Sequence, residues 1–478
     1  MTKLLPSYQI EDTYKLLRKD KRIHFIGIGG SGMNPIAKIL LDMKYVVSGS
    51  DIKENVYTLR LKDLGATIYY GHNESNIRLA DLVVISSAIK KDNVEYQAAM
   101  EKHIPIIKRA ELLAMIMEEY KKKIAISGTH GKTTVTSFIS HYLSSIGEEP
   151  TYVIGSPIKN VNLASQYGKK DFFVAEADES DRSFLFLKPN ILVITNIEEE
   201  HLDQFENLED ILDTFSKFIE RVPEEDSVLI VNGDNDNIKR LNYHGRKVIT
   251  YGLENDNTVQ ATNIQYDKHK ISYDVTINKK KVAEQISLNI PGIYNVENSL
   301  VVFAVAHYFK LSLSQVSKSF LNFDGAMRRF HKIGEADGIV VYDDYAHHPT
   351  EIKCTLAAAK SYGKRVIAIF QPHRYSRFSA FYHRFEEALS EADFIIITDV
   401  YAAGEDNVSG LTSASLSKLF PANKVRYVQK VSDISQIAVG LIQKNDLVIT
   451  LGAGDITHVS KEIYQHLKSI FEDEYKNS

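Results

Sequence analysis

Short apolar runs recur along the chain, and each is followed by glycine or polar residues and then by an amphipathic helical segment. This alternation is typical of parallel β-strands that are covered by helices on both faces of a sheet. Ligands of such sheets bind at the carboxyl ends of the strands. The sequence therefore predicts an α/β protein whose functional residues lie directly after strands.

The 478 residues exceed what one hydrophobic core normally accommodates. We predict three domains: an N-terminal Rossmann-like domain, a central domain with a P-loop ATPase-like parallel sheet, and a C-terminal Rossmann-like α/β domain. Residues 245–289 alternate β-branched and polar side chains, which predicts a small antiparallel sheet in the central domain. A lysine-rich stretch at 121–123 marks the first boundary. The predicted ranges are 1–120, 121–322 and 323–478.

Composition excludes several functional classes. A formal net charge of -5 gives no global positive field, which argues against a general nucleic-acid-binding protein. The only cysteine, Cys354, cannot form an intrachain disulfide, which fits a reducing compartment. The first residues are polar and lack the apolar core of a signal peptide, and no apolar run reaches about 18 residues. We therefore predict a cytoplasmic protein with no membrane span.

A glycine-rich turn follows the first predicted strand, which begins at Ile23. Gly27, Gly29 and Gly32 form the pattern G-x-G-x-x-G, and Asp51 ends the next predicted strand. Such a turn lets backbone amides and a helix N-terminus approach a diphosphate, and the acid can accept a hydrogen bond from a hydroxyl group. The pattern predicts nucleotide binding but does not separate NAD, FAD and a UDP-sugar. The structural alternative is that the glycines serve only close strand–helix packing.

A second glycine-rich turn, ISGTHGKTT at 126–134, follows another apolar run. Gly128 and Gly131 bracket a phosphate loop in this interpretation. Lys132 supplies a positive charge for the β- and γ-phosphates, and the Thr133 hydroxyl is placed for Mg²⁺. The loop is two residues shorter than the general G-x-x-x-x-G-K-[ST] form, which argues against a motor ATPase or GTPase. The structural alternative is a Gly-Lys turn with no ligand. We predict instead that this region binds ATP.

Two further residues of this region are candidates for a metal site. Glu176 ends the apolar run FFVAE, and its carboxylate could hold Mg²⁺. His201 follows the next predicted strand, ILVITNI. Hard cations prefer oxygen ligands, so a histidine here would more often be a structural or surface residue. Its position after a strand next to the phosphate loop favours a role in metal binding.

Polar residues of the last region gather after two predicted strands. They are Asp343, Asp344, Tyr345, His347 and His348 after the first strand, and His373, Arg374 and Arg377 after the second. Arginines and histidines at one sheet edge can bind carboxylates and phosphates, and an Arg-Arg-Phe segment at 328–330 adds cations. One alternative is a zinc site, although neither H-E-x-x-H nor paired cysteines are present. The other is solvated surface charge.

These features together predict a three-domain ligase. The central domain would use ATP to activate a carboxylate as an acyl phosphate. An amine held by the third domain would then displace phosphate. Such an enzyme must bring its substrates together and keep water away from the acyl phosphate.

Short motifs occur in a fixed order along the chain: HFIGIGGSGM, SGSD, GTHGKTT, AEADESDRSF, TNIEEEHLD, NVENS, RRF, DDYAHHPTE, QPHRYSR and LGAGDI. In these motifs the chain resembles the Mur ligase family over essentially its whole length from about residue 22. Within the family it looks like the members that add L-alanine to UDP-N-acetylmuramate. The ADESDRSF and DDYAHHPTE segments are the more discriminating parts of this resemblance.

The resemblance implies roles for residues at the matching positions. The UDP group would be held by Gly27, Gly29, Gly30, Gly32, Asp51, His72, Ser86 and Ser87. The ATP phosphates would be held by Gly128, Thr129, His130, Gly131, Lys132, Thr133 and Thr134, adenine and ribose by Asn295 and Asp344, and the γ-phosphate by Arg329. Magnesium ions would be held by Thr133, Glu176 and His201. L-alanine and the transferred phosphoryl group would be oriented by Tyr345, His347, His373, Arg374 and Arg377. The residues that would carry catalysis are Lys132, Glu176, His201, Arg329, His347, Arg374 and Arg377.

The implied reaction is an ATP- and Mg²⁺-dependent ligation in peptidoglycan precursor synthesis, by a monomer or weak homodimer. Two positions depart from the family pattern. Tyr294 replaces a histidine common before the asparagine of NVENS, and an aromatic ring there can still stack on adenine. Where several relatives carry a carbamylated lysine this chain has Ser216, with Lys217 one position away, so that role is not assigned.

Other functions remain open at this point. One is a ligase of the same family that adds a whole tripeptide or a different amino acid. Another is a nicotinamide-dependent dehydrogenase built on the first region, which leaves the phosphate loop unexplained. A third is a non-catalytic sensor of nucleotide-sugars, which predicts binding without phosphate release.

Overall fold

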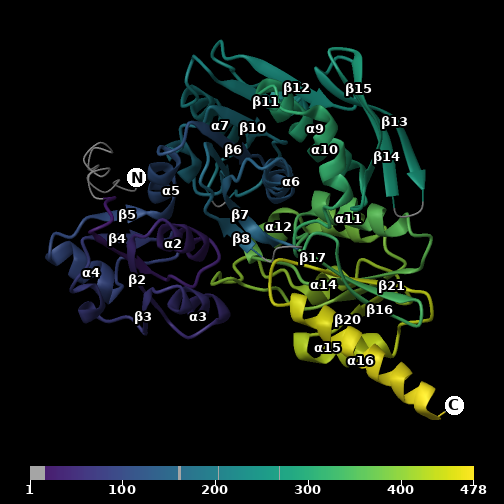
Figure 1. Cartoon of the computed structure of the whole chain (residues 1–478). Coiled ribbons are helices and arrows are strands. Elements are labelled where there is room, and N and C mark those ends of the chain that lie inside the picture. The colour runs from purple at the N-terminus through teal and green to yellow at the C-terminus, as the bar shows by residue number, and fades with distance from the viewer. Residues whose placement is uncertain (1–16, 160–162, 203, 268–269, 478) are drawn as a thin grey trace. The chain divides into compact units, whose positions relative to one another are not determined.

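The computed structural model describes residues 17–159, 163–202, 204–267 and 270–477. Contacts group the chain into two compact units. The first comprises Met1–Pro157, Val161–Ile197 and Leu212–Ile249, and the second comprises Ile158–Asn160, Glu198–Ile211 and Thr250–Ser478. The three predicted α/β regions are each built around β-sheet structure, which confirms the predicted fold class (Figure 1). The exact domain boundaries remain predictions.

The N-terminal part of the first unit is a five-stranded parallel sheet in the order β3-β2-β1-β4-β5. The order reverses between β1 and β4, and this is the point where ligands bind in open α/β sheets. The glycine-rich turn follows β1 directly. The strands are β1 (Arg22–Ile26), β2 (Val46–Asp51), β3 (Thr67–Tyr70), β4 (Leu82–Ile85) and β5 (Ile106–Lys108). The helices are α2 (Met33–Asp42), α3 (Val56–Asp63), η1 (Glu74–Ile77), α4 (Val94–Glu101) and α5 (Arg109–Met117).

The rest of the first unit contains a parallel sheet in which β6 lies between β10 and β9. Both faces of these strands are buried, which explains their uninterrupted apolar sequences. The phosphate loop therefore starts from a central strand. The elements of this part are β6 (Lys122–Ser127), α6 (Lys132–Ser145), β7 (Thr151–Ile158), β8 (Leu163–Gln166), β9 (Phe172–Glu176), η2 (Ser183–Phe186), β10 (Ile191–Ile194), α7 (Leu208–Glu220), β11 (Val228–Asn232) and α8 (Asp236–Lys239).

The second unit contains the predicted small antiparallel sheet. Strand β14 pairs antiparallel with both β13 and β15, as the alternation in 245–289 predicted. Helix α9 follows, and almost every residue from its first turn onward is buried, so Asn295 lies in the interior. The elements are β12 (Val248–Gly252), β13 (Val259–Asp267), β14 (Lys270–Ile277), β15 (Lys280–Leu288), α9 (Ile293–Tyr308) and α10 (Leu313–Leu321).

A six-stranded sheet ends the chain, in the order β16-β17-β21-β18-β19-β20. All pairs are parallel except β16–β17, an edge hairpin that the sequence did not reveal because HKIGEA is polar and half exposed. The elements are β16 (His331–Ala336), β17 (Ile339–Asp344), α11 (Pro349–Lys360), β18 (Val366–Phe370), α12 (Tyr375–Ala380), α13 (Tyr382–Leu389), β19 (Phe394–Ile397), α14 (Ser413–Ser417), β20 (Val425–Tyr427), α15 (Val431–Val439), β21 (Leu447–Leu451) and α16 (Thr457–Asn477).

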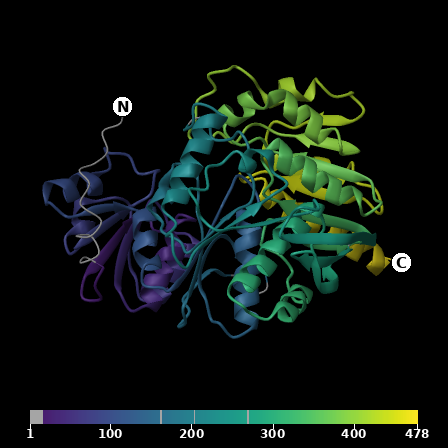
Figure 2. The ribbon, with the colours of Figure 1, turned by 90° about the horizontal axis from the view of Figure 1, so that it is seen from above.

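Two apolar cores cover the two faces of this last sheet. One is formed with α11 to α14 and includes Ile352, Phe378 and Phe385. The other is formed with α15 and α16 and includes Ile434 and Ile463. Figure 1 shows α11 on one side of the sheet and α15 and α16 on the other, and Figure 2 shows this green-to-yellow segment from above. The segments after β17 and β18 therefore start from a rigid layer.

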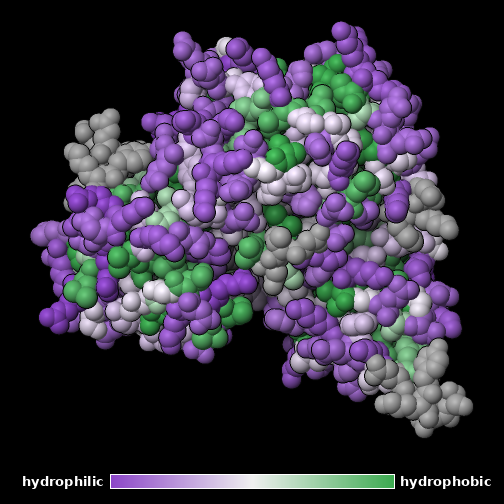
Figure 3. Space-filling model, viewed as in Figure 1, coloured by the Kyte–Doolittle hydropathy of each residue, from purple (hydrophilic) through white to green (hydrophobic). Residues whose placement is uncertain are grey.

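The surface is mixed in polarity. On the face shown in Figure 3 hydrophilic side chains dominate, and apolar ones form small groups. Among the described residues, no helix is long and apolar enough to cross a membrane.

Candidate active site

The phosphate loop occupies residues 128–131, between β6 and the 14-residue helix α6. Gly128 has φ +128° and Gly131, the N-cap of α6, has φ +85°, conformations that favour glycine. The loop amides and the positive end of the helix dipole then lie at one place, which suits a phosphate group. The predicted turn is therefore present in the geometry that phosphate binding requires.

Two residues after β10 hold this loop. The Thr129 amide donates to the Asn196 backbone carbonyl at 3.0 Å, and the His130 amide donates to Asn196 Oδ1 at 2.8 Å. Thr195 Oγ1 donates to the His130 carbonyl at 2.6 Å. Sequence reasoning missed both residues. Their polar side chains at the end of a strand adjacent to β6 were the available signal.

A substitution at Gly128 tests how closely these residues enclose the loop. A Cβ there would lie 2.2 Å from Thr195 Oγ1 and 2.8 Å from the Asn196 carbonyl oxygen. We expect Gly128→Ala to lower the free energy of unfolding by more than strained backbone alone would cost, about 1–3 kcal/mol, because the added Cβ also overlaps Thr195 and Asn196, and to weaken ATP binding. Gly147→Ala is the matched control, because Gly147 has φ +77° but no atom within 4 Å of the added Cβ. Equal losses in the two variants, measured by urea unfolding, would contradict this packing.

Lys132 is held by a carboxylate that the sequence analysis did not single out. Its Nζ lies 2.8 Å from Glu179 Oε2 and also donates to the Gly128 carbonyl at 2.6 Å. Burial raises the pKa of Glu179 to about 7, although the Lys132 charge acts in the opposite direction. Burial lowers the pKa of Lys132, but Glu179 and Asp178 raise it more, to about 12. Lys132 is therefore charged and placed at the loop.

Two of the predicted magnesium ligands lie in the first unit, after neighbouring strands. Thr133 is in the first turn of α6 and buried, and Glu176 ends β9, which pairs with β6. Glu176 Oε1 accepts a hydrogen bond from the Gly155 amide at 2.9 Å, which orients the carboxylate. A hydroxyl and a carboxylate are the oxygen ligands that Mg²⁺ prefers, so these residues fit the ion. His201 belongs to the second unit, and its participation stays a prediction.

The N-terminal glycine turn is held by Asp51. Its Oδ2 accepts a hydrogen bond from the Gly29 amide at 2.8 Å, and its Oδ1 accepts one from the Ile52 amide at 2.8 Å. A Cβ at Gly29 would lie 2.6 Å from Asn55 Nδ2, so this position requires glycine. Asp51 thus shapes the loop, and its contact with a substrate hydroxyl remains a prediction.

Other predicted UDP ligands surround this turn. His72 follows β3, and its Nδ1 lies 3.1 Å from Ser50 Oγ at the end of β2. Ser86 and Ser87 follow β4, where Ser86 is half-buried and Ser87 exposed. The sheet order places the ends of β2, β1 and β4 side by side. These predicted residues therefore share one sheet edge.

The C-terminal polar segments meet at the edge of the six-stranded sheet. The rings of His347 and His373 are 5.9 Å apart, and the Tyr345 ring lies 5.1 Å from His347. His373 also stacks on Tyr401 at 5.5 Å with an angle of 7° between the rings. The structure thus brings together three of the predicted alanine-site residues. Tyr401, in the loop after β19, was missed.

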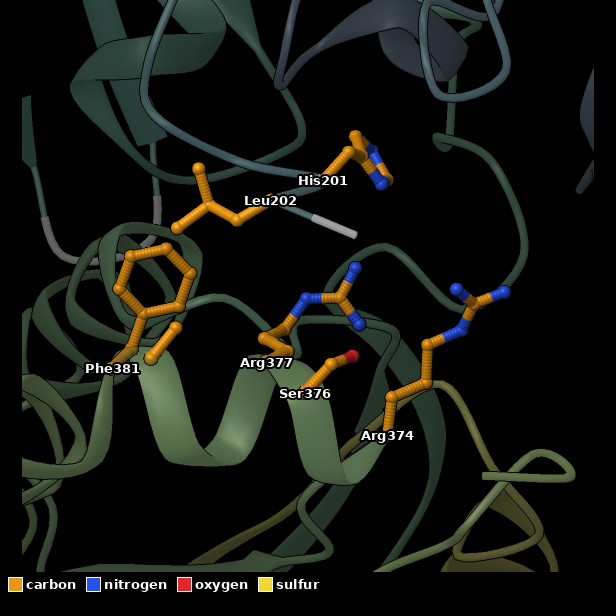
Figure 4. A pocket seen from close by; sticks show the side chains of 7 residues that line it. His201, Leu202, Arg374, Ser376, Arg377 and Phe381 are labelled. Carbon is orange, nitrogen blue, oxygen red and sulfur yellow. The ribbon is translucent and has the colours of Figure 1, made fainter. Parts of the chain in front are cut away.

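Arg377 forms a buried ion pair with Glu200, another residue that was missed. Its Nε lies 2.8 Å from Glu200 Oε1, and its Nη1 lies 3.3 Å from His373 Nδ1. A small pocket opens beside it (Figure 4), lined by His201, Leu202, Arg374, Ser376, Arg377, Ala380 and Phe381. Figure 4 shows the guanidinium groups of Arg374 and Arg377 and the His201 ring around this space. The pocket is therefore suited to an anion.

The residues predicted to contact adenine, ribose and the γ-phosphate all lie in the second unit. Asp344 is buried and accepts hydrogen bonds from the Phe330 and Ala346 amides at 2.6 and 2.7 Å. Burial raises its pKa to about 6, while the Arg329 charge acts in the opposite direction. Asn295 Nδ2 donates to the Pro291 carbonyl at 2.6 Å. Asp344 and Asn295 thus make structural hydrogen bonds here.

Arg329 lies between a carboxylate and an aromatic ring. Its Nη1 is 3.5 Å from Glu351 Oε1, and its guanidinium carbon is 5.3 Å from the centre of the Tyr345 ring. Arg328 lies 4.8 Å over the same ring. These contacts hold the cations at the sheet edge. Glu351, in the first turn of α11, was missed.

The residues that depart from the family pattern have different surroundings: Ser216 and Lys217 lie on helix α7, and Tyr294 lies in the first turn of α9. Lys217 lies on the exposed face of α7, and its Nζ is 2.5 Å from Asp213 Oδ2 one turn away. Ser216 Oγ donates to the Leu212 carbonyl within the same helix. Tyr294 is half-buried, and burial raises the pKa of its hydroxyl. Lys217 therefore makes a surface ion pair, in agreement with leaving the carbamate role unassigned.

Three residues of the candidate site have a left-handed backbone conformation, which also occurs elsewhere in the described chain, for example at Lys44 and Lys310. His201, Arg328 and Arg374 have φ values of +56°, +59° and +66°, a region that non-glycine residues rarely occupy. Each such residue costs about 1–3 kcal/mol and persists only where the surroundings impose it.

Two histidines of the C-terminal cluster, His347 and His373, are neutral at neutral pH. Burial lowers the pKa of His347 to about 4 and that of His373 to about 3, and for His373 the neighbouring His347, Arg377 and Arg374 add to the effect. Unfolded histidines have a pKa of about 6.5. As pH falls below about 6.5, the unfolded chain therefore binds protons that the folded chain does not, and stability is lost.

This pH dependence can be measured. We expect His373→Gln to reduce the loss of unfolding free energy between pH of about 7.5 and about 5.5, because one buried neutral histidine is removed. Urea unfolding at both pH values gives the difference. His383→Gln is the control, because the His383 side chain is 84% exposed. An undiminished loss in His373→Gln would show that His373 is protonated in the folded chain.

Comparisons with known proteins agree with this geometry. Residues 22–121 match the model described as "Mur ligase family, catalytic domain", residues 126–306 match "Mur ligase middle domain", and residues 328–454 match "Mur ligase, glutamate ligase domain". Together the matches span most of the chain. The chain belongs to the Mur ligase family. Each of the three matched segments of this Mur ligase contains one of the polar clusters described above.

Individual relatives support the same assignment. The UDP-N-acetylmuramate–L-alanine ligase of Geotalea daltonii is 42% identical over 455 residues, which cover 94% of this chain and 99% of the relative. The crystal structure of UDP-N-acetylmuramate–alanine ligase from Thermotoga maritima has a TM-score of 0.80 and 28% identity, covering 94% of this chain and 99% of that one. A murein peptide ligase from Psychrobacter arcticus, at 22% identity, TM-score 0.67 and coverage of 94% and 98%, shows the same fold.

Proposed function

We propose that this Mur ligase joins L-alanine to the lactyl carboxylate of UDP-N-acetylmuramate, with ATP converted to ADP and phosphate. The observation that carries the proposal is the short phosphate loop with Lys132 at its end, in a chain that aligns almost end to end with an L-alanine-adding relative. The product is a precursor of peptidoglycan, so the enzyme serves cell-wall synthesis. A dehydrogenase would leave this loop without a function.

The reaction has two chemical steps. A carboxylate oxygen of the muramoyl group attacks the γ-phosphorus of ATP, and ADP leaves, giving an acyl phosphate. The L-alanine amine then attacks the acyl carbon, and phosphate leaves through a tetrahedral intermediate. Both steps redistribute negative charge on phosphoryl oxygens, so fixed cations stabilise them most.

The residues of this chain divide that task. Lys132 and the loop amides bind the β- and γ-phosphates, and Arg329 would bind the γ-phosphate. Arg374 and Arg377 bind the carboxylate of L-alanine or the transferred phosphoryl group. Because His347 is neutral and its Nδ1 donates to the Tyr345 carbonyl, its Nε2 can accept a hydrogen bond from the alanine ammonium group. Thr133, Glu176 and His201 would hold Mg²⁺, which neutralises phosphate charge when bound.

Phosphate release from the purified protein tests the proposal. The assay contains Mg²⁺, ATP and UDP-N-acetylmuramate, with or without L-alanine, and the product is weighed by mass spectrometry. Release that needs both co-substrates, with a product heavier by one alanine residue, establishes the function. Release only with a tripeptide indicates a recycling ligase, and nucleotide-sugar binding without release indicates a sensor. Glycine and L-serine in place of L-alanine measure the discrimination.

We also propose that the enzyme acts in the cytoplasm as a monomer or weak homodimer. Its substrates are cytoplasmic metabolites under the proposed function, and no described helix could span a membrane. Light scattering across a concentration series gives the oligomeric state. A stable higher oligomer at low concentration would contradict this part of the proposal.

A further inference from the structure

The N-terminal part of the chain contains a buried carboxylate that takes no part in the proposed reaction. Glu95, in the first turn of α4, is completely buried. The groups around it are Ser50 Oγ at 2.6 Å, Asn76 Nδ2 at 2.6 Å, the Asn73 amide at 3.2 Å, and His24 Nε2 and His72 Nδ1 at 3.5 Å each. Burial alone would raise the pKa of Glu95, but hydrogen bonds from His24, Ser50 and Asn76 lower it to about 2.

Counting protons assigns the direction of each hydrogen bond. Glu95 is ionised and can only accept, so the single Ser50 hydroxyl proton points to Glu95 Oε2. Ser50 Oγ also lies 3.1 Å from His72 Nδ1 and has no second proton to give. The proton in that contact must therefore sit on His72 Nδ1. Two consecutive hydrogen bonds therefore run from His72 to Ser50 and from Ser50 to Glu95.

In the neutral ring, a proton on Nδ1 leaves the other ring nitrogen of His72, Nε2, with a lone pair. A neutral imidazole that is protonated on Nδ1 is a hydrogen-bond acceptor at Nε2. Among His72, Ser50 and Glu95, His72 is the one that reaches solvent, because its side chain is 21% exposed while Ser50 and Glu95 are fully buried. It follows β3, beside the edge where β2 ends in Asp51. The acceptor nitrogen of His72 therefore lies at the sheet edge where the UDP group is expected to bind.

We infer that Glu95 is a positioning residue: through Ser50 it fixes the His72 tautomer, so that Nε2 accepts a hydrogen bond from a hydroxyl or N–H group of the UDP moiety. The ribose hydroxyls and the uracil N3–H are the donors of that chemistry. The inference rests on the proposed nucleotide site at this sheet edge. A purely structural role would stabilise the sheet without setting the tautomer.

Glu95→Gln should reverse the direction of both hydrogen bonds, the one between Ser50 and residue 95 and the one between His72 and Ser50. The Asn73 amide and Asn76 Nδ2 both donate to Oε1, so the glutamine oxygen must take that position and its NH₂ group must face Ser50. Ser50 then accepts from Gln and donates to His72 Nδ1, and the His72 proton moves to Nε2. We expect the Kd for UDP-N-acetylmuramate to rise about tenfold, the loss of about one hydrogen bond, with unchanged KM for ATP and L-alanine.

Nitrogen-15 spectra of histidine-labelled protein read the tautomer directly, with His72→Gln used to assign the signal. The wild type should show His72 protonated on Nδ1, and Glu95→Gln should show it on Nε2. Glu101→Gln, on the exposed end of the same helix, should change neither spectrum nor Kd. If Glu95→Gln does not fold, Ser50→Ala removes the hydroxyl that joins His72 to Glu95 and should weaken the binding of UDP-N-acetylmuramate similarly.

The outcomes separate this inference from the proposed function. An Nε2-protonated His72 in the wild type, or an unchanged tautomer in a folded Glu95→Gln variant, overturns the inference whether or not the enzyme ligates alanine. Parallel losses for all substrates, with reduced thermal stability, would indicate a structural role only. A wild type without ligase activity overturns the proposed function, while the spectra still decide the tautomer.

Discussion

Lys132→Ala is expected to slow phosphate release by at least about 10²-fold, the range for loss of one group that stabilises transition-state charge. The lysine lies at the phosphate loop with its Nζ 2.6 Å from the Gly128 carbonyl oxygen, at the start of α6. ATP must attract this Nζ away from Glu179, 2.8 Å away, before the lysine can pair with the phosphates. The initial rate of phosphate release with all three substrates is the measurement.

The variant also removes a cation from a buried carboxylate, so folding must be controlled. Glu179 is only 4% exposed in its side chain, and loss of the Lys132 charge, which lowers the pKa of Glu179 against the effect of burial, lets the carboxylate bind a proton more readily. Lys132→Ala/Glu179→Gln removes the charge altogether and should be equally slow. Lys170→Ala, a surface lysine that donates to the Gly147 carbonyl, should keep the full rate. Full turnover in a folded Lys132→Ala variant would exclude this loop from the chemistry.

The features that could be predicted from the sequence are those that depend on local sequence patterns. The buried parallel strands β6, β9 and β10 are continuous apolar runs, and the loop after β6 carries its glycines and lysine in a fixed spacing. The antiparallel piece was recognisable from alternation in 245–289. Each of these depends on residues close together in the chain. This is why the fold class was predicted correctly and the glycine-rich turn lies directly after β6, as expected.

The missed residues depend on contacts between distant segments. Glu179 is 47 positions from Lys132, and Glu200 is 177 positions from Arg377. Both acids stand in runs of charged residues, where a solvated surface role is the ordinary expectation. Only the fold shows that their carboxylates are buried against cations. Glu95 was missed for the same reason, since its partners come from strands β1 and β2 and from the segment after β3.

Arg377 shows how such a contact changes a prediction. The role that the resemblance implies for Arg377, orienting L-alanine, would by itself predict that Arg377→Ala mainly raises the KM for L-alanine. In the structure the Arg377 and Glu200 side chains are 9% and 5% exposed and 2.8 Å apart. Removing the cation leaves a buried carboxylate to be compensated, which costs about 3–5 kcal/mol in other proteins. We therefore expect Arg377→Ala to lower the free energy of unfolding by that amount and also to raise the KM for L-alanine.

A second substitution separates the two effects. Arg377→Ala/Glu200→Gln removes the buried charge, so most of the lost stability should return while the KM for L-alanine stays raised. Arg374→Ala is the matched control for stability, because Arg374 is 40% exposed and lies 3.8 Å from Glu405, a contact worth less than about 1 kcal/mol. Urea unfolding and steady-state kinetics give both quantities. A stable Arg377→Ala variant would mean that the ion pair is weak in solution, and a raised KM for ATP alone would move Arg377 from the alanine carboxylate to the phosphoryl group.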